Sequence, residues 1–178
     1  MTRLIAASLA AALIIFTPTV SLTSAAHAAE QKAGTFMLKD PTIRATLPGQ
    51  KVAGGYLTIH NMGPDTDRLI GGMAAFAGKV EIHEMKMDGG VMKMRALPNG
   101  LKLEAGTSQT LKPGGNHVMF MQLKEPMKEG ETHNATLVFE KAGKVAVTFT
   151  VKSIGDTMKM KEGHGHNHGG NHSHSHSD

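Results

Sequence analysis

The chain has 178 residues, a formal net charge of +4, only 4% aromatic residues and no cysteine. The absence of cysteine excludes disulfides, thiol redox chemistry and thiolate metal sites such as blue-copper or cysteine-zinc centres. Lysines are spread along the chain and tryptophan is absent, so the basic stripes and stacking platforms of nucleic-acid-binding proteins are not indicated. The unusual feature is the count of 13 methionines and 11 histidines.

The N-terminus has the pattern of a secretory signal peptide. Arg3 precedes an apolar run from Leu4 to Phe16, and small residues then lead to the sequence SAAHAAEQ. The apolar run is too short to span a bilayer, which takes about 20 residues, and no later segment approaches that length. We expect residues 1–28 to be removed and the protein to act in the periplasm, without a transmembrane segment.

After a short lead at residues 29–34, residues 35–152 show short strand-like runs separated by Gly, Pro and Asp turns. Among these runs are GGYLTIHN, KVEIHEMKM, VMKMRAL, HVMFMQL, NATLVFEK and KVAVTFTVK. No window has convincing helical periodicity. The pattern predicts one all-β domain, an antiparallel sandwich or barrel.

Residues 153–178 differ in composition from the rest, because Gly, Ser, Asn, Lys and His replace the apolar residues. This segment is expected to be a disordered tail rich in Met and His. Its imidazoles alternate with small residues, unlike an uninterrupted purification tag, and are suited to a borderline ion such as Cu(II), Zn(II) or Ni(II). The tail histidines are His164, His166, His168, His172, His174 and His176.

Histidine and methionine share strand faces within the β domain. Side chains of a strand alternate with period two, so His83, Met85 and Met87 are expected on one face. The same rule puts Met92 with Met94, and it puts His117 with Met119 and Met121.

A metal site is one interpretation of these faces, and a buried sheet face is the other. Any single methionine is more simply explained as core packing, but β-branched residues fill strand cores better, and packing does not explain the histidines. Thioethers prefer soft Cu(I), and imidazole accepts copper, zinc or nickel. Because methionine is a poor zinc ligand, the mixed donor set favours Cu(I).

The chain resembles the PCuAC family of periplasmic copper chaperones over residues 35–152. The family signature is a His, ten residues, a Met, twenty-one residues and then His-x-Met. His83 and Met94 have the first spacing, and the sequence HVM contains His117 and Met119. The resemblance implies a cupredoxin-like Greek-key β barrel that binds one Cu(I) through these four residues.

One spacing departs from the signature, because twenty-two residues separate Met94 from His117. We expect the extra residue in the turn ALPNG, where a loop absorbs added length at little cost. Met92, two residues earlier on the same face, is the alternative ligand. Met85 and Met87 would then be a soft, apolar surround of the copper.

The resemblance also implies a partner, either the cytochrome c oxidase subunit that carries the CuA centre or a thiol-bearing assembly protein. The chaperone is expected to be a monomer, with its tail as an auxiliary Cu(II) site. The alternative function is a periplasmic copper- or zinc-sequestering resistance protein that delivers nothing. An enzyme is not expected, because the chain has no carboxylate pair, nucleophile with base or phosphate loop arranged for catalysis.

Overall fold

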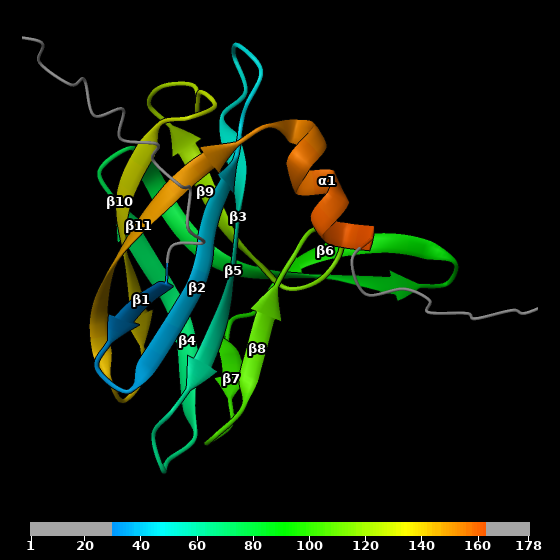
Figure 1. Ribbon diagram of the computed structural model, residues 1–178. Coiled ribbons are helices and arrows are strands. Elements are labelled where there is room, and N and C mark those ends of the chain that lie inside the picture. Colours follow the sequence, from blue (N-terminus) through cyan, green and yellow to red (C-terminus); the bar gives the residue numbers. More distant parts are fainter. Residues whose placement is uncertain (1–29, 163–178) are drawn as a thin grey trace, which may run out of the picture.

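The computed structural model describes residues 30–162, which form eleven strands and one helix (Figure 1). The elements are β1 (Glu30–Ala33), β2 (Phe36–Arg44), β3 (Val52–Asn61), β4 (Asp67–Ala74), β5 (Ala77–Asp88), β6 (Val91–Ala96), β7 (Leu101–Leu103), β8 (Ser108–Leu111), β9 (His117–Leu123), β10 (Thr132–Phe139), β11 (Gly143–Lys152) and α1 (Ile154–Glu162). The signal segment and the tail histidines lie outside the described residues.

Seven of the strands close into a barrel in the order β2, β11, β10, β4, β5, β9 and β3, and the pairing of β3 with β2 completes the ring. Strands β1, β6, β7 and β8 each pair with one strand of this ring. Neighbouring strands are antiparallel except β11 and β2, which run parallel. The predicted all-β, cupredoxin-like barrel is confirmed.

The barrel interior is filled by alternate residues of the strands. In β11, the sequence KVAVTFTVK buries its valines and Phe149 while the residues between them are more exposed, which is the period-two pattern of a strand with one face in the core. The four phenylalanines that are almost fully buried come from β2, β9, β10 and β11, so one core is shared by strands distant in the sequence.

Strand β5 belongs to the barrel only in its first half. Its pairing with β9 ends at His83, and its outer half then pairs with β6 alone. The two strands form an arm that projects from the barrel (Figure 1). Gly89 and Gly90 connect them in a two-residue turn with φ of 59° and 80°, the left-handed values that a type I′ hairpin turn requires.

The prediction of disorder from residue 153 onward is wrong for residues 154–162, which form α1. The Ser153 hydroxyl accepts a hydrogen bond from the Asp156 backbone N–H, which is an N-cap. Thr157 is fully buried, and its hydroxyl accepts a hydrogen bond from Arg44 Nε at 3.0 Å. Composition missed the helix because it does not record a local cap such as Ser153, and because the bond between Arg44 and Thr157 joins distant parts of the chain. Within residues 30–162, no helix has the length and apolar character needed to cross a membrane.

Candidate metal site

His83 and His117 lie directly opposite each other on neighbouring strands. They are register partners of β5 and β9, and their ring centroids are 5.9 Å apart. Residues that face each other across an antiparallel pair share a face, so both rings leave the outer side of the barrel wall. Val118 and Ile82, one residue away on each strand, point instead into the core. The structure therefore brings together two histidines separated by 33 intervening residues.

Each nitrogen of the His83 ring has a different environment. Nε2 lies 2.9 Å from Glu81 Oε2 and donates to it, while Nδ1 is buried and has no hydrogen-bond partner among the described residues. The tautomer that makes this bond leaves the lone pair of Nδ1 free. A carboxylate that holds one nitrogen of a histidine whose other nitrogen is open is the common support of a metal-binding imidazole.

Glu81 is itself held as a carboxylate. Lys79 and then His83 hydrogen-bond to it, and these bonds hold the pKa of Glu81 below its usual value. A deprotonated Glu81 accepts from His83 and fixes the orientation of that ring.

In His117 the other ring nitrogen, Nδ1, makes the hydrogen bond. Its Nδ1–H donates to the Gly115 carbonyl at 2.9 Å, which leaves the lone pair of Nε2 free. Only 4% of this residue is exposed, and burial lowers the pKa of His117, an effect that exceeds the opposing influence of the Gly115 bond. The imidazole is thus kept neutral, which is the form that binds metals. The same Gly115 carbonyl accepts from the Met85 backbone N–H at 3.1 Å, so the loop at residues 112–116 is tied to the β5–β6 arm.

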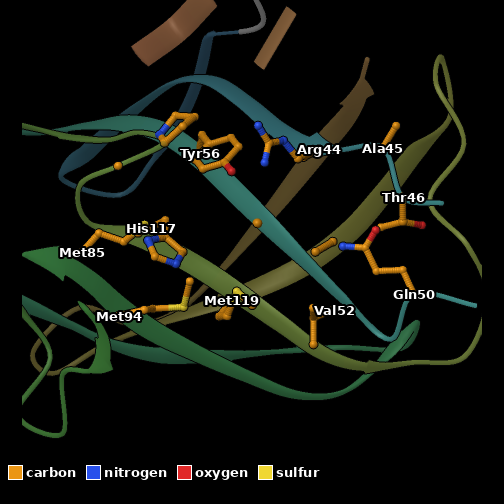
Figure 2. A pocket seen from close by; sticks show the side chains of 14 residues that line it. Arg44, Ala45, Thr46, Gln50, Val52, Tyr56, Met85, Met94, His117 and Met119 are labelled. Atoms are coloured by element: carbon orange, nitrogen blue, oxygen red, sulfur yellow. The ribbon is translucent and has the colours of Figure 1, made fainter. Parts of the chain in front are cut away.

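A pocket of about 270 Å³ opens beside His117, and three methionines line it. These are Met85, Met94 and Met119. In Figure 2 the side chain of Met94 points toward His117 and Met119. His83 does not line the pocket, but it adjoins the site through its pairing with His117.

The hairpin register separates Met94 from Met92. Met94 is the partner of Met85 and reaches the pocket, whereas Met92 is the partner of Met87 and lies two residue pairs farther out, away from the pocket wall. Of the sequence-predicted set, the structure therefore groups His83, Met94, His117 and Met119 and leaves Met92 apart.

The sequence predicted Met85 and Met87 as an apolar surround of the copper. In the structure Met85 lines the pocket, and Met87 does not. Only the cross-strand register shows that Met85 lies opposite Met94.

Strand β3 closes another side of the pocket. Gly54 is the partner of Met119, and a Cβ at Gly54 would lie 2.5 Å from the Tyr56 hydroxyl oxygen, so glycine leaves room for that ring. Tyr56 is 7% exposed, and burial raises its pKa despite the opposing charge of Arg44, so its phenol stays neutral. Tyr56 was not identified from the sequence, although the stretch GGYLTIHN places two glycines directly before it.

The donor types of the site favour a soft metal ion. No group of three or more His, Asp and Glu side chains within residues 30–162 is arranged to hold a metal ion. Two imidazole nitrogens are instead accompanied by neutral thioethers, which bind Cu(I) far better than zinc or hard cations. The arrangement can hold a monovalent soft ion without any thiolate.

Comparisons with known proteins agree with the fold and with this region. Residues 36–151, which span the barrel, match the family model described as "Putative lipoprotein LpqE-like". A protein of Leifsonia xyli subsp. xyli, "Putative lipoprotein Lxx21020", is 27% identical over 91% of this chain and 98% of its own length.

Solved structures of PCuAC domains are also similar. The copper-bound PCuAC domain from PmoF2 is 29% identical with a TM-score of 0.59, over 70% of this chain and 98% of that domain. The CuI form of DR1885 from Deinococcus radiodurans is 29% identical with a TM-score of 0.51, over 74% of this chain and 85% of that protein. The expected resemblance to PCuAC domains is confirmed, and the chain belongs to the LpqE-like family.

Proposed function

We propose that this protein is an exported copper chaperone that binds one Cu(I) at the site formed by His83, Met94, His117 and Met119. The observation that carries the proposal is the pair of facing imidazoles, each fixed by one nitrogen and open at the other, beside a pocket lined by thioethers. Two of the similar structures, the PmoF2 domain and DR1885, are described as copper-bound or CuI forms, which supports the same metal here.

Release of the metal follows from the same ligands. Thioethers are weak, neutral ligands, and a thiolate acceptor binds Cu(I) more strongly. We infer that copper passes to the CuA subunit of cytochrome c oxidase, or to a thiol-bearing assembly protein. Copper is cargo in this scheme, and the protein acts as a monomeric carrier in the periplasm, not as an enzyme.

The tail would be an auxiliary Cu(II) site. Its six alternating histidines suit Cu(II), and tethering raises the local copper concentration near the domain. The described residues end in α1, and Thr157 of that helix accepts a hydrogen bond from Arg44, which lines the copper pocket.

The Cu(I) site is tested by anaerobic competition titration of the full chain with a chromogenic Cu(I) chelator. Met94→Ile and Met119→Ile should each weaken binding at least about tenfold, because each removes a ligand. Met73→Ile is the matched control, since Met73 is similarly exposed on β4, away from the site. Unchanged affinity in both site variants would contradict the proposal.

A sequestering protein is the alternative function, favoured only by the histidine count of the tail. A full-length variant with the six tail histidines changed to asparagine separates the two. A delivery protein should keep one Cu(I) and sustain oxidase activity in cells, whereas a sequestering protein should lose most of its metal capacity and copper tolerance. Transfer of Cu(I) to a purified CuA domain or to a thiol-bearing assembly protein then identifies the recipient.

A further inference from the structure

The projecting arm carries two adjacent methionine pairs. Met85 lies opposite Met94, and Met87 lies opposite Met92 at the next same-face position outward. Side chains opposite each other on antiparallel strands have Cβ atoms about 4.5–5.5 Å apart. Four thioethers therefore form one continuous patch that begins at the pocket and extends toward the tip of the arm.

These methionines do not fill a core. Every residue of β6 is exposed, and the exposed fractions of Met87, Met92 and Met94 are 59%, 42% and 48%. By comparison, Met127 is fully buried, as a methionine used for packing would be. On an exposed strand face, polar or β-branched residues stabilise the strand at least as much as methionine does. Packing therefore does not account for thioethers at these positions.

The two faces of the arm carry different kinds of side chain, charged residues on one and methionines on the other. The face opposite the methionines carries charged residues, including the ion pairs Glu84–Arg95 and Asp88–Lys93. These two pairs lie on the face of the hairpin away from the methionines. Met92 and Met94 alternate along β6 with Lys93 and Arg95 of the other face, so the donors at the methionine face itself are neutral sulfurs, although a pocket of the arm brings Lys86, Asp88, Lys93 and Arg95 beside Met87 and Met94.

We propose that Met85, Met87, Met92 and Met94 form a second Cu(I) site, made of thioethers alone, on the outer part of the β5–β6 arm. The proposal rests on the proposed copper function only for the identity of the metal. Met85 and Met94 also line the inner pocket, so the two sites share ligands and copper can move between them by stepwise ligand exchange. Thioethers are neutral and the ion stays Cu(I), so neither a proton nor an electron is transferred.

The outer site should be the weaker of the two. It has no imidazole, and three of its ligands, Met87, Met92 and Met94, are exposed, so binding must order their side chains. Because Met94 is a ligand of the inner copper, we expect the outer site to fill after the inner one through Met85, Met87 and Met92. It should accept the soft monovalent ions Cu(I) and Ag(I) but not Zn(II).

The test follows each methionine methyl group by NMR in the full chain labelled with ¹³C-methyl methionine, titrated with Ag(I) or, anaerobically, with Cu(I). Met119 reports on the inner site, and Met87 and Met92 report on the outer one. The Met119 signal should shift first, and the Met87 and Met92 signals should shift at higher metal ratios. Signals of Met87 and Met92 that stay unmoved through three equivalents would overturn the proposal.

Variants link the later shifts to the outer site. Met87→Ile/Met92→Ile should weaken binding of the later metal, followed at Met85, at least about tenfold and leave the Met119 response intact. The control Met73→Ile should leave both stages as in the unaltered chain. If the double variant binds as the unaltered chain does, or if Met87 and Met92 respond to an acceptor protein but never to metal, the arm is not a copper site.

Failure of this inference is distinguishable from failure of the proposed function. His117→Asn removes an imidazole from the inner site and should make the Met87 and Met92 signals shift at lower metal ratios. If Met119 never responds while Met87 and Met92 do, the proposed inner site fails and the outer one stands. The converse result supports the proposed function and overturns the outer site.

Discussion

The two imidazoles of the site present opposite ring nitrogens, Nδ1 of His83 and Nε2 of His117. One ring is fixed by a carboxylate and the other by a backbone carbonyl. Holding a ligand in one tautomer before the metal arrives reduces the reorganisation that binding requires. Glu81 is therefore a positioning residue of the proposed site, although it does not supply a ligand.

Changing Glu81→Ala should weaken Cu(I) binding about 10–100-fold, because His83 loses the bond that holds its tautomer. Competition titration with a Cu(I) chelator measures the effect. Glu84→Ala is the control: Glu84 is on the same strand but pairs with Arg95 on the opposite face, and its removal should leave the affinity unchanged. Equal losses in the two variants would indicate a general effect of charge and would contradict a positioning role.

Met92 and Met94 differ in position, although both belong to the same face of β6. Only Met94 borders the pocket. We expect Met92→Ile to leave the affinity of the first bound Cu(I) within about twofold, while Met94→Ile lowers it at least about tenfold. A larger loss in Met92→Ile than in Met94→Ile would reverse the ligand assignment.

At the scale of elements, α1 depends on its N-terminal cap and on its contact with the barrel. The Ser153 hydroxyl accepts from the Asp156 backbone and donates to the Asp156 carboxylate. Bonds from Ser153 and Lys159 lower the pKa of this carboxyl, and a negative charge in the first turn suits the helix dipole. The buried Thr157 then fixes the helix against Arg44.

Ser153→Ala should destabilise α1 by about 1 kcal/mol, since it removes the cap of one backbone N–H. Hydrogen exchange should show faster exchange in residues 154–162 and unchanged protection in the barrel strands. Lys159→Ala is the control, because that side chain is 79% exposed and its ion pair with Asp156 is worth little. If protection in α1 is the same in Ser153→Ala as in the unaltered chain, the cap does not stabilise the helix.

At the scale of the whole molecule, Asp67 connects strands that are distant in the sequence. It is 5% exposed, and its carboxylate accepts from the backbone N–H groups of Arg68, Lys141 and Ala142 at 2.7–3.0 Å. Burial raises the pKa of Asp67, but the three N–H donors together outweigh burial, so the pKa lies below its usual value. The start of β4 is thus held to the turn between β10 and β11.

The acid stability of the fold follows from this lowered pKa. The contribution of Asp67 is fully present above the unfolded pKa of about 3.9 and is lost as the pH falls through the lower folded value. Asp67→Asn should reduce the free energy of unfolding at pH 7 by about 1–3 kcal/mol and flatten its decline below about pH 4. Urea unfolding across pH measures both effects. The exposed Asp65→Asn should change neither, and an unaltered acid profile in Asp67→Asn would refute the assignment.

Barrel closure was only partly predictable. Runs such as KVAVTFTVK and NATLVFEK alternate clearly and are strands in the structure. Strand β2 contains Pro41 and a register shift, and β4 contains Gly71 and Gly72, so their local patterns are weaker although their buried side chains belong to the core. The parallel pairing of β11 with β2 joins residues about a hundred positions apart, which no local pattern reveals.

The sequence by itself determined the all-β class, the thiol-free chemistry and the faces that histidine and methionine share, because strand side chains alternate with a fixed period. The tertiary structure alone decided which faces meet. It paired His83 with His117, put Met85 and Met94 instead of Met87 and Met92 at the pocket, and packed the helix at residues 154–162 against Arg44. The physical reason is that register and docking depend on hydrogen bonds and contacts between distant segments, whereas face and composition are local properties of the chain.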